Sequence, residues 1–332
     1  MKRRRLTLGL AAVAGLAMIS TAQAGPGFDV VTLGARGGIE DGNLSAFMIA
    51  PAGDGRAVTC DAGSLVNGLR VADEKGAFDS VVVPADSPFT RVGYVLTEQI
   101  KGYLISHAHM DHIAGLVIAS PDDAKKPIYG LASVMDKVQG TYFNWQAWPN
   151  FGSGGREPQL KKYELTALAP GERHELAGTA MHVTAYPLSH GGVESTAFLI
   201  ESGEDALLCF GDTGPDEVEK STAIADVWTA VAGLVKEKRL KAVIIEVSYD
   251  NAQSDQQLFG HLTPAWLRKS LAGLEAAAGA GSLSGLPVVI SHIKYSLKKG
   301  QSPQDRILAE LEAGNTLGIR YIVPEQGDAW RF

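Results

Sequence analysis

The segment "YLISHAHMDHIAG" places three histidines and one aspartate within six positions, directly after an apolar run. In an extended segment, His107 and His109 point to the same side because side chains alternate with a period of two, so both can reach one metal ion. The turn that follows sends Asp111 and His112 toward a neighbouring position. Burying three imidazole rings and a carboxylate together costs desolvation free energy unless the groups bind a ligand such as a metal ion. The segment therefore predicts metal ligands.

These four residues cannot complete two sites, since each zinc-like ion needs at least three protein ligands and a water. Three other apolar runs end at once in a ligand-type residue, namely His190, Asp212 and His292. A hydroxide shared by two ions about 3.5 to 4 Å apart would be a nucleophile at neutral pH. The pattern predicts a dinuclear hydrolytic centre. The simplest assignment gives one ion His107, His109 and His190, and the other Asp111, His112 and His292, with Asp212 bridging.

Short apolar runs followed by turn residues recur along the chain and predict a sheet-rich α/β protein. The eleven runs are FDVVTLG, LSAFMIA, AVTCDAG, GYLISHAH, PIYGL, AMHVTAYPLSH, AFLIESG, ALLCFGD, KAVIIEVS, LPVVISH and RYIVPEQG. Helices are expected at about 131–140, 215–238, 263–279 and 302–314. The last two begin at Thr263 and Ser302, each an N-cap residue followed by proline.

The first 24 residues have the pattern of a cleavable signal peptide. A basic start, an apolar run of roughly 15 residues and "AQA" before Gly25 fit export, and the run is shorter than the roughly 20 residues that span a bilayer. We therefore expect a signal peptide at 1–24 and a single catalytic domain at 25–332. The mature protein is expected in the periplasm or secreted, without a membrane segment.

Charge and cysteine content exclude some classes of protein. Without the leader, the 30 basic residues fall to 26 against 37 acidic ones, a net charge of about −11. Such a chain, with no Lys/Arg cluster, is poorly suited to bind a nucleic acid polymer. The only cysteines are Cys60 and Cys209, so this is not a disulfide scaffold. Each ends an apolar run, which favours buried free thiols and leaves a bridge open.

The motif "HAHMDHIAGL" matches the HxHxDH signature of the metallo-β-lactamase fold, and "SHAHMDHIAGLVIASP" closely resembles the signature of class II 3′,5′-cyclic-nucleotide phosphodiesterases. The segments DGNLSAFMI, CDAGS, FNWQAWPNF, IIEVSYDN and LFGHLTP resemble the same enzymes in the same order. The resemblance implies a four-layer αββα sandwich with two divalent metal ions at one edge. It implies zinc, although manganese or iron would accept the same donors.

The same resemblance implies hydrolysis of cAMP or cGMP to the 5′-nucleotide. The expected catalytic residues are Asp111, Glu246 and His261, because a similar Glu and His-x-Thr pair occurs in transfer RNA 3′-processing endonucleases of this fold. There the pair is thought to pass a proton to the leaving oxygen, and a ribose 3′-alkoxide leaves poorly without one. Asn43 and Ser45 are expected near the metal or phosphate, while turn structure explains "DGN" equally well.

Other interpretations stay open at this point. Another hydrolase of the same fold, a phosphodiesterase for other esters or a lactonase, would share the metal ligands. A binding protein that kept the fold is a third possibility, which a full ligand set disfavours. His261 could also be only an N-terminal helix residue before Thr263. The aromatic segment at 141–151 could stack on a base, form a homodimer surface or pack a loop over the core.

Overall fold

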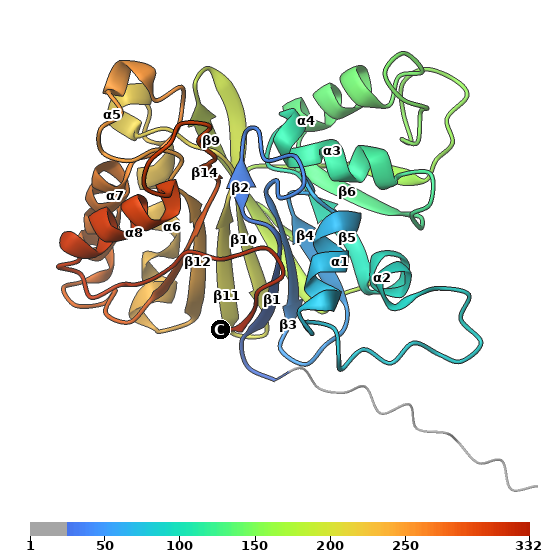
Figure 1. The fold of residues 1–332 in the computed structure, drawn as a ribbon, viewed down its shortest axis with the longest axis horizontal. Helices are drawn as coiled ribbons and strands as arrows, with labels where there is room; N and C mark the ends of the chain where they lie inside the picture. Colours follow the sequence, from blue (N-terminus) through green and yellow to red (C-terminus); the bar gives the residue numbers. More distant parts are fainter. Residues whose placement is uncertain (1–24) are drawn as a thin grey trace, which may run out of the picture.

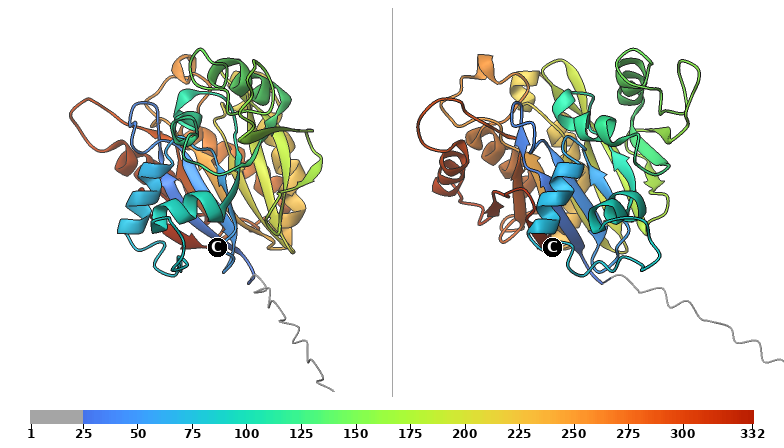
Figure 2. Two further views of the ribbon diagram at one scale, coloured as in Figure 1. Left: turned by 90° about the vertical axis from the view of Figure 1, so that its right-hand side faces the viewer. Right: turned by 45° about the vertical axis from the view of Figure 1, so that its right-hand side comes forward.

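The computed structural model describes residues 25–332. Two seven-stranded sheets pack face to face, and helices cover the outer face of each sheet (Figures 1 and 2). The expected four-layer αββα arrangement is therefore confirmed. The expected signal peptide at 1–24 lies outside the described residues. No helix within 25–332 has the length and apolar character needed to cross a bilayer.

The first sheet has the strand order β16-β1-β3-β4-β5-β6-β7. Its strands are β1 (Phe28–Gly34), β3 (Ala46–Pro51), β4 (Ala57–Cys60), β5 (Ile100–Leu104), β6 (Lys126–Leu131), β7 (Tyr163–Leu168) and β16 (Ala329–Arg331). The helices on its side of the molecule are α1 (Val66–Glu74), α2 (Arg91–Tyr94), α3 (Met110–Ala119) and α4 (Ala132–Lys137), with π-helical turns at Val95–Gln99 and Val138–Tyr142 (Figure 1).

The second sheet has the order β15-β13-β12-β11-β10-β9-β8. Its strands are β8 (Arg173–Glu175), β9 (Met181–His190), β10 (Val193–Ser202), β11 (Asp205–Phe210), β12 (Leu240–Glu246), β13 (Pro287–Ser291) and β15 (Arg320–Ile322). Its outer layer holds α5 (Asp216–Glu219), α6 (Ala223–Lys236), α7 (Pro264–Ala278) and α8 (Pro303–Ala313). A small parallel pair joins β2 (Arg36–Gly37) to β14 (Ile293–Lys294).

Every one of the eleven apolar runs contains a strand, as the sequence predicts. The central strands β11, β12 and β13 of the second sheet are apolar on both faces because both faces are covered. In β11, Leu207 and Cys209 face the core between the sheets, whereas Leu208 and Phe210 join the cluster packed against the outer helices. This burial on both sides is typical of parallel strands.

Strand direction brings distant parts of the sequence to one edge of the sandwich. β4, β5 and β6 are parallel in the first sheet, and β11, β12 and β13 are parallel in the second. Parallel strands end at the same edge of a sheet, which is where ligands of α/β proteins bind. The residues that follow these strands are therefore neighbours in space.

The four expected helices form, but one is divided. Thr263 and Ser302 cap α7 and α8 as predicted, accepting hydrogen bonds from the amides of Trp266 and Asp305. The expected single helix at 215–238 is wrong, because the chain turns at Lys220, where φ is +56°, and makes α5 and α6.

The side chain of Asp216 accounts for this division. Its carboxylate accepts hydrogen bonds from the amides of Ile224 and Ala225 at 3.1 and 3.0 Å, and so it caps the start of α6. That contact requires the chain to reverse between Asp216 and α6.

Cys60 and Cys209 form a disulfide, so the expectation of free thiols is wrong. Cys60 ends β4 and Cys209 lies in β11, which places the bridge between the two sheets. Both residues are almost fully buried. Sequence alone could not reveal whether the bond forms, because the two positions are 149 residues apart and meet only when the sheets pack.

Replacing both cysteines by alanine should lower the free energy of unfolding by roughly 2 to 4 kcal/mol, since the bridge restricts the unfolded chain. Urea denaturation of oxidised wild type and variant measures the difference. A reducing agent should bring the wild type close to the variant and leave the variant unchanged. Equal unfolding free energies for the oxidised wild type and the variant would contradict the prediction.

Candidate metal centre

The metal-ligand candidates gather at the edge where the strands end. His107 and His109 lie in the loop after β5, and Asp111 and His112 lie in the first turn of α3. A helix therefore stands where we expected a turn. His190 ends β9 in the facing sheet. The site is thus built from both halves of the sandwich.

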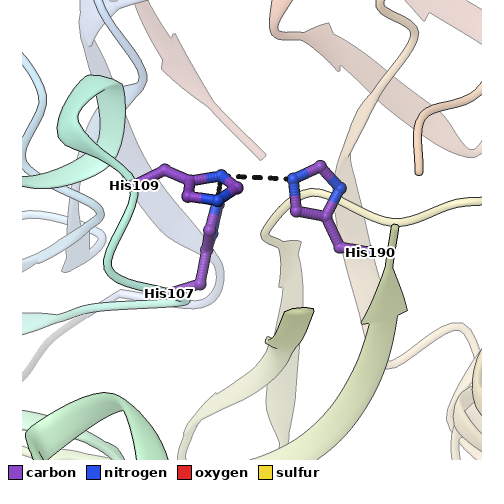
Figure 3. A group of neighbouring side chains, drawn as sticks. All are labelled: His107, His109 and His190. Carbon is purple, nitrogen blue, oxygen red and sulfur yellow. Dashed lines mark hydrogen bonds between the residues drawn. The ribbon is translucent and has the colours of Figure 1, made fainter. Parts of the chain in front are cut away.

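His107, His109 and His190 form the first cluster (Figure 3). His109 Nδ1 lies 2.9 Å from His107 Nε2 and 3.3 Å from His190 Nε2. Burial lowers the pKa of His107 well below its ordinary value and also lowers that of His190. Both rings are therefore neutral at pH 7, and neutral imidazole is the form that binds a metal.

Asp111, His112 and His292 form the second cluster. Asp111 Oδ2 lies 3.2 Å from His292 Nε2, and Asp111 Oδ1 lies 4.0 Å from His112 Nε2. Gly38 donates its backbone N–H to Asp111 Oδ2 at 2.8 Å, which fixes the carboxylate. Asp111 is half-buried and His109 is exposed, whereas His112 and His292 are buried. The clusters thus open to solvent on the side of His109 and Asp111.

Asp212 stands between the clusters. Its Oδ2 atom lies 3.2 Å from Nε2 of both His112 and His292, 3.7 Å from His190 Nε2 and 3.9 Å from His107 Nε2. Burial alone would raise the pKa of this carboxyl, but His112 and His292 hold it well below its ordinary value. A buried anion in contact with both clusters is the arrangement that a bridging ligand needs.

The second nitrogen of four histidines is already engaged, which tests whether the cluster fits metal ions. Nδ1 of His107 lies 3.0 Å from Ser106 Oγ, and Nδ1 of His112 lies 2.7 Å from Asp61 Oδ2. Nδ1 of His190 lies 2.7 Å from the Gly260 carbonyl oxygen, and Nδ1 of His292 lies 2.9 Å from Ser248 Oγ. These contacts leave each Nε2 facing the centre. Metal-binding histidines nearly always use their other nitrogen in this way.

His112 supplies a second sign of fit. Its Nε2 atom is buried and lies 3.2 Å from Asp212 Oδ2, but within residues 25–332 it has no partner in good hydrogen-bond geometry. Burial would lower the pKa of His112, but the carboxylates of Asp212 and Asp61 raise it well above its ordinary value. The surroundings of this nitrogen therefore favour a cation, and the residues present fit a divalent metal.

Glu246 and His261 form a buried pair beside the clusters. His261 Nδ1 lies 2.9 Å from Glu246 Oε1, which also accepts the backbone N–H of Thr213 at 2.9 Å. Burial would lower the pKa of His261, but Glu246 raises it. The His261 ring lies 4.7 Å from the His190 ring, centroid to centroid. His261 therefore lies against the ligand cluster as well as just before α7.

Asn43 lies in a turn, in which its backbone N–H donates to the Glu40 carbonyl. Its side chain accepts the N–H of Ala35 at 3.0 Å and donates to Glu40 Oε1 at 3.0 Å. These contacts agree with the turn explanation of "DGN". Ser45 is buried next to β3. A role in substrate binding stays a prediction for both residues.

The aromatic segment at 141–151 mainly packs a loop over the core. Phe143 is fully buried against Phe151 and Tyr163, and Trp148 Nε1 donates to Ser120 Oγ at 2.9 Å. Among the aromatic residues of this segment, only Trp145 is exposed. This supports the packing alternative.

Sequence reasoning missed several residues that hold the ligands. Asp61 accepts hydrogen bonds from Ser106 N at 2.8 Å and Ser106 Oγ at 2.9 Å, in addition to its contact with His112. Asp61 follows the strand β4 directly, so the strand-end pattern that revealed Asp212 could have found it. Ser248 lies two residues after the end of β12.

Gly37 allows His292 to approach. A Cβ atom at position 37 would lie 2.2 Å from His292 Cε1 and 2.3 Å from its Nδ1. These distances are too short for any residue other than glycine at this position. We therefore expect Gly37→Ala to displace the His292 ring and to weaken zinc binding about tenfold or more. Competition with a chromophoric chelator measures the affinity.

Gly233→Ala is the matched control. Position 233 lies within α6, and a Cβ there meets nothing within 4 Å among the described residues. That variant should bind zinc like the wild type. Equal zinc affinity for the Gly37 variant would show that the close approach is unimportant.

The chain resembles known proteins over almost all of its described length. Residues 30–327 match the family described as cAMP phosphodiesterases class-II. A 3′,5′-cyclic-nucleotide phosphodiesterase of Aliivibrio fischeri is 54% identical over 313 residues, which cover 94% of each chain. The crystal structure of unliganded yeast PDE1 matches with a TM-score of 0.80 and 25% identity, over 92% of this chain and 99% of that one.

A more distant structure identifies the fold. The metallo-β-lactamase fold protein YhfI from Bacillus subtilis matches with a TM-score of 0.61 and 16% identity, over 93% of this chain and all of that one. Together with the match over nearly the whole described chain, these likenesses leave one conclusion. The chain belongs to the class-II cAMP phosphodiesterases, a family of enzymes, and it has the metallo-β-lactamase fold.

Proposed function

We propose that this enzyme hydrolyses 3′,5′-cyclic nucleotides, cAMP or cGMP, to 5′-nucleotides with two bound divalent ions. One observation carries the proposal: two three-residue ligand clusters share the buried carboxylate of Asp212 and adjoin the Glu246–His261 pair. The relative from Aliivibrio fischeri is named a 3′,5′-cyclic-nucleotide phosphodiesterase, which supports the same substrate here.

The donor set supports the choice of metal. It consists of imidazole nitrogens and carboxylate oxygens without a thiolate, and both cysteines are used in the disulfide. Zinc fits these donors, and manganese or iron accepts them too. When bound, the ions would stabilise charge on the phosphate oxygens and make a water nucleophilic at neutral pH.

The chain's own residues would supply the rest of the reaction. Asp111, fixed by the Gly38 N–H, would orient the attacking water on the open side of the site. Attack in line with the 3′ oxygen breaks the bond between phosphorus and that oxygen and leaves a 5′-nucleotide.

The leaving 3′ oxygen needs a proton, because an alkoxide leaves poorly. His261 would supply it from Nε2, the ring nitrogen that the contact with Glu246 leaves free. General acid catalysis of this kind contributes typically about 10²- to 10⁴-fold. Glu246 would orient the ring and stabilise its positive charge.

Turnover of cAMP by residues 25–332 tests the function. We expect 5′-AMP, resolved by chromatography, and loss of activity on chelation. Asp212→Asn should lower kcat/KM by more than about 100-fold, because loss of a hydrogen-bond partner of a metal ligand typically costs about 10- to 100-fold and Asp212 would be a ligand itself. Asp122→Asn, at an exposed position, is the control. Cleavage of a lactone or another phosphodiester with cAMP left intact would refute the substrate.

We also propose that the protein is exported and that cleavage leaves Gly25 as its first residue. The disulfide supports a location outside the cytoplasm, because such bridges persist mainly in oxidising compartments. Mass spectrometry of the protein from fractionated cells should find a mature N-terminus at Gly25 outside the cytoplasm. Full-length protein recovered only from the cytoplasm would refute the proposal.

A further inference from the structure

The hydroxyl group of Ser248 lies between a metal-ligand candidate and the acid pair. Ser248 follows β12 and is 2% exposed. Its Oγ atom lies 2.6 Å from Glu246 Oε2, 2.9 Å from His292 Nδ1 and 3.1 Å from His261 Nδ1. Ser248 therefore contacts both parts of the site that the proposed reaction uses.

The hydrogen atoms in this group can be assigned from the chemistry of each partner. A hydroxyl donates one hydrogen and accepts through its lone pairs, whereas an ionised carboxylate only accepts. Ser248 has two possible acceptors, Glu246 Oε2 at 2.6 Å and the His292 carbonyl at 3.2 Å, and we assign its hydrogen to the closer, charged carboxylate. Its oxygen is left to accept the N–H of His292 Nδ1 at 2.9 Å.

This assignment fixes the tautomer of His292. With its hydrogen on Nδ1, the lone pair of His292 is on Nε2, which lies 3.2 Å from both Asp111 Oδ2 and Asp212 Oδ2. His261 donates from Nδ1 to Glu246 Oε1 at 2.9 Å, so its Nε2 remains for the substrate. A single hydroxyl thus connects His292 to the carboxylate that orients His261.

We propose that Ser248 is a positioning residue that couples the metal ligand His292 to the Glu246–His261 pair. The proposal rests on the proposed function, in which the leaving group is a poor alkoxide. Without the hydroxyl, the N–H of His292 loses its acceptor and Glu246 loses one of its donors. Both the metal-binding side and the proton-donating side should then be affected.

Ser248→Ala should weaken zinc binding about 10- to 100-fold, as is typical when the hydrogen-bond partner of a metal-binding histidine is removed. At saturating zinc, kcat for cAMP should fall more than kcat for bis(p-nitrophenyl) phosphate. The p-nitrophenolate ion leaves without a proton, so only cAMP depends on the orientation of His261. A purely structural role would lower both rates alike.

The control is Ser195→Ala, which removes another buried hydroxyl. Ser195 lies in β10, and its Oγ atom makes no hydrogen bond in the described part of the chain. It should keep the zinc affinity and the ratio of the two rates. Thermal unfolding checks that each variant folds, and Ser248→Gly, which deletes the same hydroxyl, replaces the alanine variant if that one does not.

A double variant tests the route through His261. In a His261→Ala background, Ser248→Ala should still weaken zinc binding but should no longer change the ratio of the two rates. If Ser248→Ala behaves like Ser195→Ala while the wild type cleaves cAMP, the inference is overturned. Unchanged zinc affinity in Ser248→Ala would also overturn the inference. If the wild type binds zinc but does not cleave cAMP, it is the proposed function that fails.

Discussion

The carboxylate of Asp212 is the contact on which the site depends. It is nearly inaccessible to solvent, and its Oδ2 atom lies within 4 Å of a nitrogen of four ligand histidines that come from both sheets. An isolated buried anion is costly, so its stability requires positive charge at the same place. Cation binding and the packing of the two sheets are therefore linked at this atom.

The groups behind the ligands make this arrangement rigid. Asp61, Ser106, Ser248 and the Gly260 carbonyl each hold one histidine nitrogen, and three of these four residues follow the end of a strand. Asp61 and His292 have φ angles of +55° and +57°, in the left-handed region that non-glycine residues rarely adopt. Local backbone strain of about 1 to 2 kcal/mol per residue is tolerated there because hydrogen bonds fix the side chains.

Much of this could be predicted because the ligands follow buried strands. An apolar run that ends in His or Asp is visible in the sequence, and parallel strands bring such ends together. His190, Asp212 and His292 can therefore be identified as ligand candidates from the sequence alone. Contacts that depend on the approach of two segments cannot. Nothing local to Gly37 indicates an imidazole against its backbone.

The same limit explains the errors in the fold. The helix at 215–238 has an unbroken helical pattern, but a carboxylate that caps a later turn outweighs propensity at Lys220. The start of α3 within the histidine motif was hidden for a different reason. The "HMDH" run shows its ligands clearly but contains no helix-start signal beyond them.

The disulfide has a consequence for how loss of metal would spread through the molecule. Cys60 precedes Asp61 by one residue and Cys209 precedes Asp212 by three, so the bridge crosses the sandwich just below the ligand edge. With the bridge intact, separation of the sheets at an empty site stops at this covalent link. In a reduced chain the same opening would meet only non-covalent contacts, namely side-chain packing and hydrogen bonds such as that from Gly27 N to Asp205 Oδ2. We therefore expect the oxidation state of the cysteines to set how far a metal-free site can open.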